Sequence, residues 1–206
     1  QIMGSAAGVM IGYLCGSVPF GLLVGRLKGV DIRRHGSGNI GATNVGRVLG
    51  RWWGILAFFL DLAKGLLPVM VFGMFARRWM TPVGALRPTI FLLWSAVAAA
   101  CVLGHLFPVF LRFKGGKGVA TSLGALLGVY PYFTLPGLVV FGLWVVLTLA
   151  TRYVSVGSVG AAVAFPVGFT LFAASRRNLW GSAADLWPLH AFAIIIALLV
   201  VYRHRA

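Results

Sequence analysis

Residues 88–111 read PTIFLLWSAVAAACVLGHLFPVFL, a run of 24 residues without a lysine, arginine, aspartate or glutamate. A helix of about 20 predominantly apolar residues is long enough to cross the hydrocarbon layer of a bilayer. Comparable runs recur along the chain of 206 residues, which is 60% hydrophobic and only 10% charged. The pattern predicts an all-α integral membrane protein whose residues 1–206 form a single transmembrane domain.

Seven transmembrane helices are expected. The uncharged segment 118–151 is too long for one span, and Pro131 and Pro136 predict a turn that divides it into a short helix and a longer one. The first 25 residues lack the basic start of a signal peptide, so we interpret them as a helix. The expected spans are residues 2–25, 52–76, 88–111, two within 118–151, 154–174 and 186–202.

The distribution of lysine and arginine predicts the orientation. With the N-terminus outside, twelve of these residues fall in inner connections, Arg205 included, and five in outer ones, Arg87 included, while Lys64 lies within a span. Positive charge is enriched on the cytoplasmic side of membrane proteins. We therefore expect the N-terminus outside, the C-terminus inside, and both glycine-rich loops at the cytoplasmic face.

Composition limits the kinds of partner. The net charge of +15 would suit nucleic acid, but the basic residues punctuate apolar spans instead of forming a soluble basic face, so no nucleic-acid partner is expected. The only carboxylates are Asp31, Asp61 and Asp185, too few for a multi-carboxylate metal site. Cys15 and Cys101 fall in apolar spans and are expected to be buried hydrophobic residues. We expect no metal and no cofactor.

The connection after the first span is long and polar, reading KGVDIRRHGSGNIGATNVGR over residues 28–47. It offers hydroxyl and amide groups, glycines that permit close backbone approach, and an arginine suited to a phosphate or carboxylate. Such residues also form ordinary turns, but helix connections rarely need more than about eight residues. Anion binding is therefore favoured over a plain connection, through Gly36, Ser37, Gly38, Asn39, Thr43, Asn44 and Arg47.

A second glycine loop, RFKGGKGVATS, occupies residues 112–122. Glycines allow backbone N–H groups to converge on an anion, and the start of the following helix favours negative charge. The alternative is a positively charged turn. A third connection, TRYVSVGS at 151–158, reads by itself as membrane anchoring and helix capping. Together the three connections predict one cytoplasmic pocket for phosphate-bearing molecules, to which the second loop contributes Lys114, Gly115, Gly116, Lys117, Gly118 and Thr121.

Two ionisable features lie inside expected spans. Asp61 and Lys64 are three residues apart on one helical face, and we favour a structural pair, or an Asp61 bond to a basic loop residue, over a catalytic role. His105 has no aspartate five residues later to complete a His-x4-Asp dyad, so a buried, hydrogen-bonded histidine is favoured over a base. Glycines spaced four apart in the first span, ending at Gly16, predict close helix packing.

These segments, in this order, resemble the acyl-phosphate-dependent glycerol-3-phosphate acyltransferases of bacteria, the PlsY family. GSGNIGATN at 36–44 together with FKGGKG at 113–118 is highly specific. The family pattern continues with an asparagine three residues after His204, beyond Ala206. The other matching stretches are GSVPFG at 16–21, LDLAKG at 60–65, GHLFPVF at 104–110, RYVSVGS at 152–158 and YRHR at 202–205.

The resemblance implies a seven-helix enzyme of the bacterial inner membrane whose active site faces the cytoplasm. It would transfer a fatty acyl group from acyl phosphate to the sn-1 hydroxyl of glycerol 3-phosphate, giving lysophosphatidic acid and inorganic phosphate in the first acylation of phospholipid synthesis. We expect a monomer that needs no cofactor. The implied catalytic residues are Ser37, Ser158 and His204, with Asn39, Arg47 and Lys117 at substrate phosphates. Beside these, we expect a possible supporting role for Asp61, Lys64 and His105.

Two other functions fit parts of the pattern. A transporter or exchanger for a phosphorylated metabolite also places polar, glycine-broken segments beside helices. However, the polar groups gather on one side of the membrane, and the hydropathy shows no inverted repeat. A scaffold that binds anionic lipid explains the charge but not the serine, asparagine and glycine content. The acyl-chain length preference, the assignment of each phosphate to a loop and the proton acceptor stay open at this point.

Overall fold

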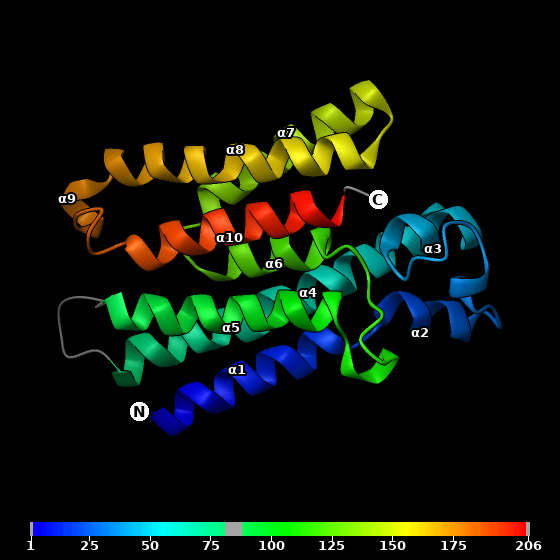
Figure 1. The fold of residues 1–206 in the computed structure, drawn as a ribbon, viewed down its shortest axis with the longest axis horizontal. Coiled ribbons are helices and arrows are strands. Elements are labelled where there is room, and N and C mark those ends of the chain that lie inside the picture. Colours follow the sequence, from blue (N-terminus) through cyan, green and yellow to red (C-terminus); the bar gives the residue numbers. More distant parts are fainter. Residues whose placement is uncertain (1, 81–87, 205–206) are drawn as a thin grey trace.

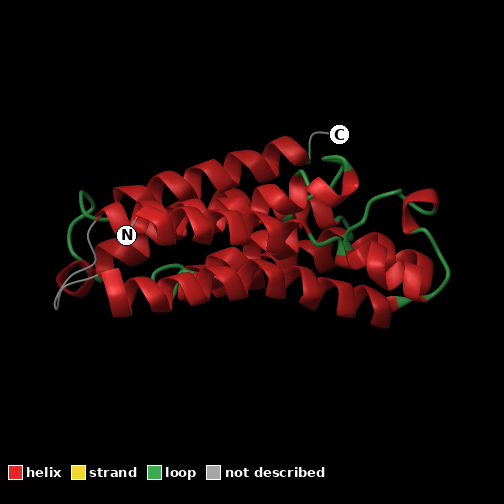
Figure 2. Cartoon of the chain, turned by 90° about the horizontal axis from the view of Figure 1, so that it is seen from below, coloured by secondary structure: helices red, strands yellow, loops and turns green. Residues whose placement is uncertain are grey.

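The computed structural model describes residues 2–80 and 88–204, so Arg87 and Arg205 lie outside the described residues (Figure 1). The described segments are helical, joined by turns and short loops (Figure 2). The α-helices are α1 (Ile2–Ser17), α2 (Phe20–Leu27), α3 (Ala42–Leu49), α4 (Arg51–Phe75), α5 (Pro88–Leu106), α6 (Val119–Gly128), α7 (Thr134–Thr151), α8 (Val154–Ser175), α9 (Arg177–Trp180) and α10 (Trp187–Arg203); shorter turns are η1 (Ile32–Arg34), η2 (Ala76–Met80) and η3 (Val109–Leu111).

The longer helices lie side by side along one axis of the molecule (Figure 1). α1 packs on α5, α4 on α6, α7 on α8, and α10 fills the space between α8 and α5. α2, α3, the loop after α5 and the last turn of α10 gather at one end of the bundle, whereas α9 and the start of α1 lie at the other. Polar segments far apart in the sequence therefore meet at a single end.

Five helical segments are long and apolar enough to cross a membrane: Ala6–Leu27, Arg51–Arg78, Pro88–Leu111, Thr134–Thr151 and Val154–Ser175. Large apolar side chains also cover the outside of the bundle; Leu149 is 74% exposed and Leu171 69%. A protein in water rarely presents such a surface, whereas lipid accommodates it. The fold is that of an all-α integral membrane protein. α6 and α10 are shorter, with 10 and 17 residues, so the count of seven crossings stays a prediction.

The first expected span is wrong in one respect, because it is two helices. α1 ends at Ser17 and α2 starts at Phe20, with Pro19 between them. Proline has no N–H to continue the helical hydrogen bonds, so a break frees carbonyl groups that must find other donors inside a membrane. The Val18 carbonyl accepts the Phe20 N–H at 3.1 Å and, as its shorter bond, the ammonium of Lys64 at 2.7 Å. A charge within α4 thus satisfies the break in its neighbour.

Other boundaries also differ from expectation. The third span ends as an α-helix at Leu106, and Pro108 initiates the short turn η3. The turn inside 118–151 is confirmed, but Pro136 lies in the first turn of α7, where its missing N–H would have no helical partner anyway. The first polar connection is not all loop, because α3 forms within it and carries Arg47.

Glycines allow α4 and α6 to pack backbone to backbone. A Cβ atom on Gly124 of α6 would overlap the Leu62 carbonyl oxygen, and one on Gly65 of α4 would overlap the Thr121 carbonyl oxygen. Helix packing in membranes depends on such close approach of small residues. This contact sets the position of Asp61 and Lys64, which α4 carries, relative to the start of α6 at Val119, directly after the glycine loop.

Gly124→Ala is therefore expected to lower the stability of the folded protein in detergent by about 1–3 kcal/mol, the usual cost of inserting a methyl group into a closed packing contact. The measurement is the midpoint of thermal unfolding. Gly142→Ala is the matched control, because nothing lies within 4 Å of a Cβ at that position. Equal midpoints for the two variants would contradict the close contact between α4 and α6.

Candidate functional site

A polar cavity of about 460 Å³ lies at the end of the bundle where α3, the start of α6, the start of α8 and the end of α10 converge. It draws on every one of the polar segments that the sequence singled out. Its lining residues are Ser37, Asn39, Gly41, Ala42, Thr43, Asn44, Arg47, Phe58, Asp61, His105, Lys117, Gly118, Val119, Ala120, Trp144, Val154, Ser155 and His204.

Asn44 organises the first loop. Its side chain is 1% exposed, its Nδ2 donates to the carbonyls of Ile32, His35 and Asn39 at 2.9–3.1 Å, and its Oδ1 accepts the Ser37 N–H at 2.8 Å. Every hydrogen-bonding atom of this amide is thereby used inside the loop. Asn44 thus shapes the loop that presents Ser37 to the cavity, and what it can still offer a ligand is small.

The rest of the first loop leaves several donors facing the cavity. Asn39 Oδ1 accepts the Gly41 N–H at 2.8 Å, so its Nδ2 is the part of the amide left for a ligand. Ser37 and Arg47 are exposed and line the cavity. Gly36 and Gly38 shape the loop without lining the cavity. At its start, the carboxylate of Asp31 accepts from the guanidinium of Arg33 at 2.6 Å, and this bond lowers the pKa of Asp31.

Two N–H groups of the glycine loop are used within the protein. The N–H groups of Gly115 and Gly116 donate to the carbonyls of Leu106 and His105, both at 3.2 Å, so they cap the end of α5 and do not face an anion. Our expectation for these two groups is wrong, because the last carbonyls of α5 need donors. Lys117 and Gly118 line the cavity, whereas Lys114 is exposed and lies outside its lining.

A buried ionisable cluster forms the floor. Asp61 and Lys64 have side chains only 3% exposed, and Lys64 Nζ lies 2.7 Å from Asp61 Oδ1, so the expected i, i+3 pair is present. The Thr121 hydroxyl donates to the Asp61 carbonyl at 3.0 Å and can therefore accept from His105 Nδ1 at 3.2 Å. His105 is buried and hydrogen-bonded, as predicted. Asp61 and His105 line the cavity, whereas Lys64 and Thr121 are not among its lining residues.

The two serines at the start of α8 have different surroundings in the structure. Ser155 lines the cavity, and the sequence analysis did not single it out. Ser158 lies almost one turn further along, 3% exposed, where its Oγ donates to the Val154 carbonyl at 2.8 Å and accepts from Trp144 Nε1 at 3.2 Å. Ser155 lies in the first turn of α8, directly after the polar connection. That position in the sequence could have identified it as a cavity residue.

His204 follows α10 and lines the cavity. Burial lowers its pKa below the ordinary value of a histidine, and the nearby cations Lys117 and Arg203 also lower it. Burial and the two cations thus favour the neutral imidazole, against the opposing effect of the bond to the Val200 carbonyl. Its Nδ1 donates to the Val200 carbonyl at 2.8 Å, since a carbonyl can only accept. Nε2 is left with a lone pair that can accept a hydrogen bond from a ligand.

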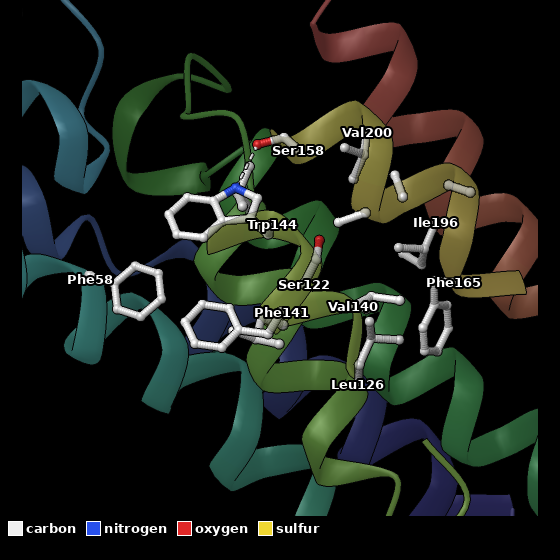
Figure 3. A pocket seen from close by; sticks show the side chains of 15 residues that line it. Phe58, Ser122, Leu126, Val140, Phe141, Trp144, Ser158, Phe165, Ile196 and Val200 are labelled. Carbon is white, nitrogen blue, oxygen red and sulfur yellow. Dashed lines mark hydrogen bonds between the residues drawn. The ribbon is translucent and has the colours of Figure 1, made fainter. Parts of the chain in front are cut away.

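An apolar pocket of about 70 Å³ adjoins the polar cavity (Figure 3). The two share Phe58, Val119 and Trp144 in their linings. Trp144 stacks on Phe141, with ring centres 5.7 Å apart, and forms the wall at this boundary. Beyond it the pocket is lined by α6, α7, α8 and α10 down to Leu126, Val140, Phe165 and Ile196. A molecule with a polar head and an apolar chain would match this pair of pockets.

The charges of the polar cavity suit an anion. Arg47 and Lys117 line it, and the carboxylate among its lining residues, that of Asp61, is paired with Lys64. Arginine and lysine are the side chains that recognise phosphate. Within residues 2–80 and 88–204, no three His, Cys, Asp or Glu side chains come together as they would to hold a metal ion.

Known proteins share both the sequence and the fold. The family model described as glycerol-3-phosphate acyltransferase matches residues 6–206. The glycerol-3-phosphate acyltransferase of Geobacter sulfurreducens is 44% identical over 195 residues, covering 95% of this chain and 87% of its own. That of Aquifex aeolicus is 40% identical over 203 residues, covering 96% and 90%.

Solved structures agree. The crystal structure of PlsY (YgiH), an integral membrane glycerol 3-phosphate acyltransferase in its glycerol 3-phosphate form, superposes with a TM-score of 0.79 at 37% identity, covering 98% of this chain and 88% of that one. Its lysophosphatidic acid form gives a TM-score of 0.77 at the same identity and coverage.

Proposed function

The chain belongs to the glycerol-3-phosphate acyltransferase family, and from this membership we propose that it transfers a fatty acyl group from acyl phosphate to the sn-1 hydroxyl of glycerol 3-phosphate. The products are lysophosphatidic acid and inorganic phosphate. The observation that carries the proposal is a cationic polar cavity that opens onto an apolar pocket. One part suits two phosphates, and the other suits the start of an acyl chain.

We propose that the enzyme is a monomer of the bacterial inner membrane with its cavity on the cytoplasmic side. The excess of lysine and arginine in the connections at that end supports this orientation. In this proposal the protein crosses the bilayer seven times, through the five long helices together with the shorter apolar helices α6 and α10; the five long, apolar helices support it. The polar cavity then opens where soluble glycerol 3-phosphate arrives, and the apolar pocket lies at the depth of the lipid chains.

The reaction needs alignment more than activation. The substrate hydroxyl oxygen forms a bond to the carbonyl carbon of the acyl phosphate, the bond from that carbon to the phosphate oxygen breaks, and phosphate departs. The hydroxyl proton passes to an oxygen of the departing phosphate. Acyl phosphate already has a good leaving group, so the main task of the protein is to hold two anions close together and in line.

We assign the binding of the phosphates and the orientation of the hydroxyl to particular residues. Arg47 and Lys117 hold the two phosphates, aided by donors from Ser37 and Asn39 of the first loop. His204 accepts a hydrogen bond at Nε2 from the neighbouring sn-2 hydroxyl and so orients the glycerol, which leaves the proton of the sn-1 hydroxyl for the departing phosphate. Ser155 takes the place that the family pattern gave to Ser158, because Ser155 lines the polar cavity, whereas Ser158 lines the adjoining apolar pocket and donates to the Val154 carbonyl.

The direct test gives purified protein, in detergent or lipid mesophase, palmitoyl phosphate and glycerol 3-phosphate. We expect inorganic phosphate and lysophosphatidic acid in equal amounts, and only when both substrates are present. A transporter would release neither product and would show activity only in sealed vesicles. Failure to form lysophosphatidic acid with folded protein would overturn the proposed reaction.

The same assay includes a matched pair of serine variants. Ser155→Ala is expected to lower kcat by about tenfold or more, as for loss of a donor at the reacting group. Ser158→Ala removes a hydroxyl that bonds to Trp144 and Val154, and is expected to retain most of the turnover. The reverse order of effects would return the catalytic role to Ser158.

A further inference from the structure

We propose that Arg203 is a positioning residue that directs Lys117 into the polar cavity by holding the peptide group between Gly116 and Lys117. The proposal rests on the proposed function for the role of Lys117 as a phosphate-binding residue. Arg203 is not among the residues that line the cavity, so its effect on the substrate passes through the glycine loop.

One side of the loop is fixed by α5. The Gly116 N–H donates to the His105 carbonyl at 3.2 Å, and a Cβ atom on Gly116 would overlap Nε2 of the His105 ring. The ring is itself held by Thr121 at 3.2 Å. The peptide group that precedes Gly116 therefore has a fixed place against the end of α5.

Arg203 fixes the other side. Its Nη2 donates to the Gly116 carbonyl at 2.9 Å, from a half-buried position with the guanidinium 5.8 Å from the ring centre of Phe107. That carbonyl and the N–H of Lys117 belong to one planar peptide group. With both peptide groups of Gly116 held, the direction in which the Lys117 side chain leaves the backbone is largely determined.

The charge of Arg203 is available for this role. The chain has three carboxylates; Asp31 bonds to Arg33, Asp61 to Lys64, and Asp185 to Ser182. Within residues 2–80 and 88–204 no ion pair involves Arg203, and a guanidinium makes a strong, charge-assisted bond to a carbonyl. The next residue, His204, lines the cavity. The end of α10 thus supplies one side chain to the cavity and one to the loop beside it.

The different positions of Lys114 and Lys117 support a role of Arg203 in directing Lys117. Lys114 and Lys117 are three residues apart, yet Lys114 is exposed and Lys117 lines the cavity. The residues held by α5 and α10 are Gly115 and Gly116, directly before Lys117. The restraint therefore acts where it can set the direction of Lys117 and not that of Lys114.

The experiment is a double-mutant cycle in the acyl-transfer assay, with KM measured separately for glycerol 3-phosphate and palmitoyl phosphate. We expect Arg203→Ala to raise KM about three- to tenfold, as for loss of one charged hydrogen bond, and for the same substrate that Lys117→Ala affects. In the Lys117→Ala background, the further effect of Arg203→Ala should fall below about twofold, because coupled residues are not additive. Arg203→Lys should recover part of the loss.

The control is Arg176→Ala, an exposed arginine at the opposite end of the bundle, which should leave both KM values unchanged. Effects of Arg203→Ala that multiply with those of Lys117→Ala, or that fall on the other substrate, would mean direct substrate binding and would overturn the proposal. So would a lowered thermal midpoint with unchanged KM.

Protection against thermal unfolding by inorganic phosphate provides a readout without turnover. We expect less protection in Arg203→Ala than in the wild type, and equal protection would overturn the proposal. Wild-type protein that binds phosphate but transfers no acyl group would refute the proposed reaction while leaving this test of Arg203 intact.

Discussion

Lys117→Ala is expected to lower kcat/KM about 10²- to 10³-fold, while the protein remains folded. Lys117 is a cation of the glycine loop that lines the polar cavity, close enough to His204 to affect its pKa. Removing one preorganised charged donor from a site where anionic charge must be stabilised commonly has an effect of this size. The measurement is phosphate release from palmitoyl phosphate with glycerol 3-phosphate varied.

Lys114→Ala is the matched control for this prediction. Lys114 belongs to the same loop and carries the same charge, but it is exposed and does not line the cavity. If the loop acts only through its general positive potential, the two variants will lose similar activity. Near-normal turnover of Lys117→Ala would refute the assigned role of Lys117, whichever substrate phosphate it is expected to hold.

The helices were predictable because lipid imposes a simple requirement on sequence. Backbone polar groups inside a bilayer must be bonded within the segment, so spans appear as long uncharged runs. The break at Pro19 was missed because hydropathy is averaged over a window of residues, and one proline inside an apolar segment hardly changes that average. What closes that break is Lys64, 46 residues further along the chain, and a window on the sequence cannot connect the two.

The sequence predicted which segments form the site, but it predicted less well which groups of each segment face the cavity. Polar glycine loops on one predicted face led to the cavity, and Ser37, Asn39, Arg47, Lys117 and His204 do line it. The N–H groups of Gly115 and Gly116 were misjudged, because the sequence does not show that the end of α5 needs them.

The serines of α8 show the limit of a family motif. Ser155 and Ser158 are three residues apart at the start of one helix, and the motif contains both. In the fold, Ser155 lines the polar cavity, whereas Ser158 lines the adjoining apolar pocket and accepts from Trp144 of α7. The contact is between side chains of different helices, so it became visible only in the fold.

Lys64→Met is expected to destabilise the protein by about 3–5 kcal/mol, the usual cost of leaving one member of a buried ion pair without its partner. Both side chains of the pair are 3% exposed, and Lys64 also donates to the Val18 carbonyl at the break between α1 and α2. The substitution removes both interactions while keeping a side chain of similar length. The measurement is thermal unfolding in detergent, and Lys28→Met, at an exposed lysine, should leave the midpoint nearly unchanged.

The double variant Asp61→Leu with Lys64→Met separates structure from chemistry. Replacing both members of a buried pair by apolar residues of similar volume is often neutral for stability, so the double variant should melt at a higher temperature than Lys64→Met alone. Asp61 lines the cavity and contacts His105 at 3.7 Å, whereas Lys64 does not line it. If the pair is only structural, activity should return together with stability. A double variant that is stable yet inactive would contradict the structural interpretation and give the Asp61 carboxylate a part in the reaction, through His105 or the substrate itself.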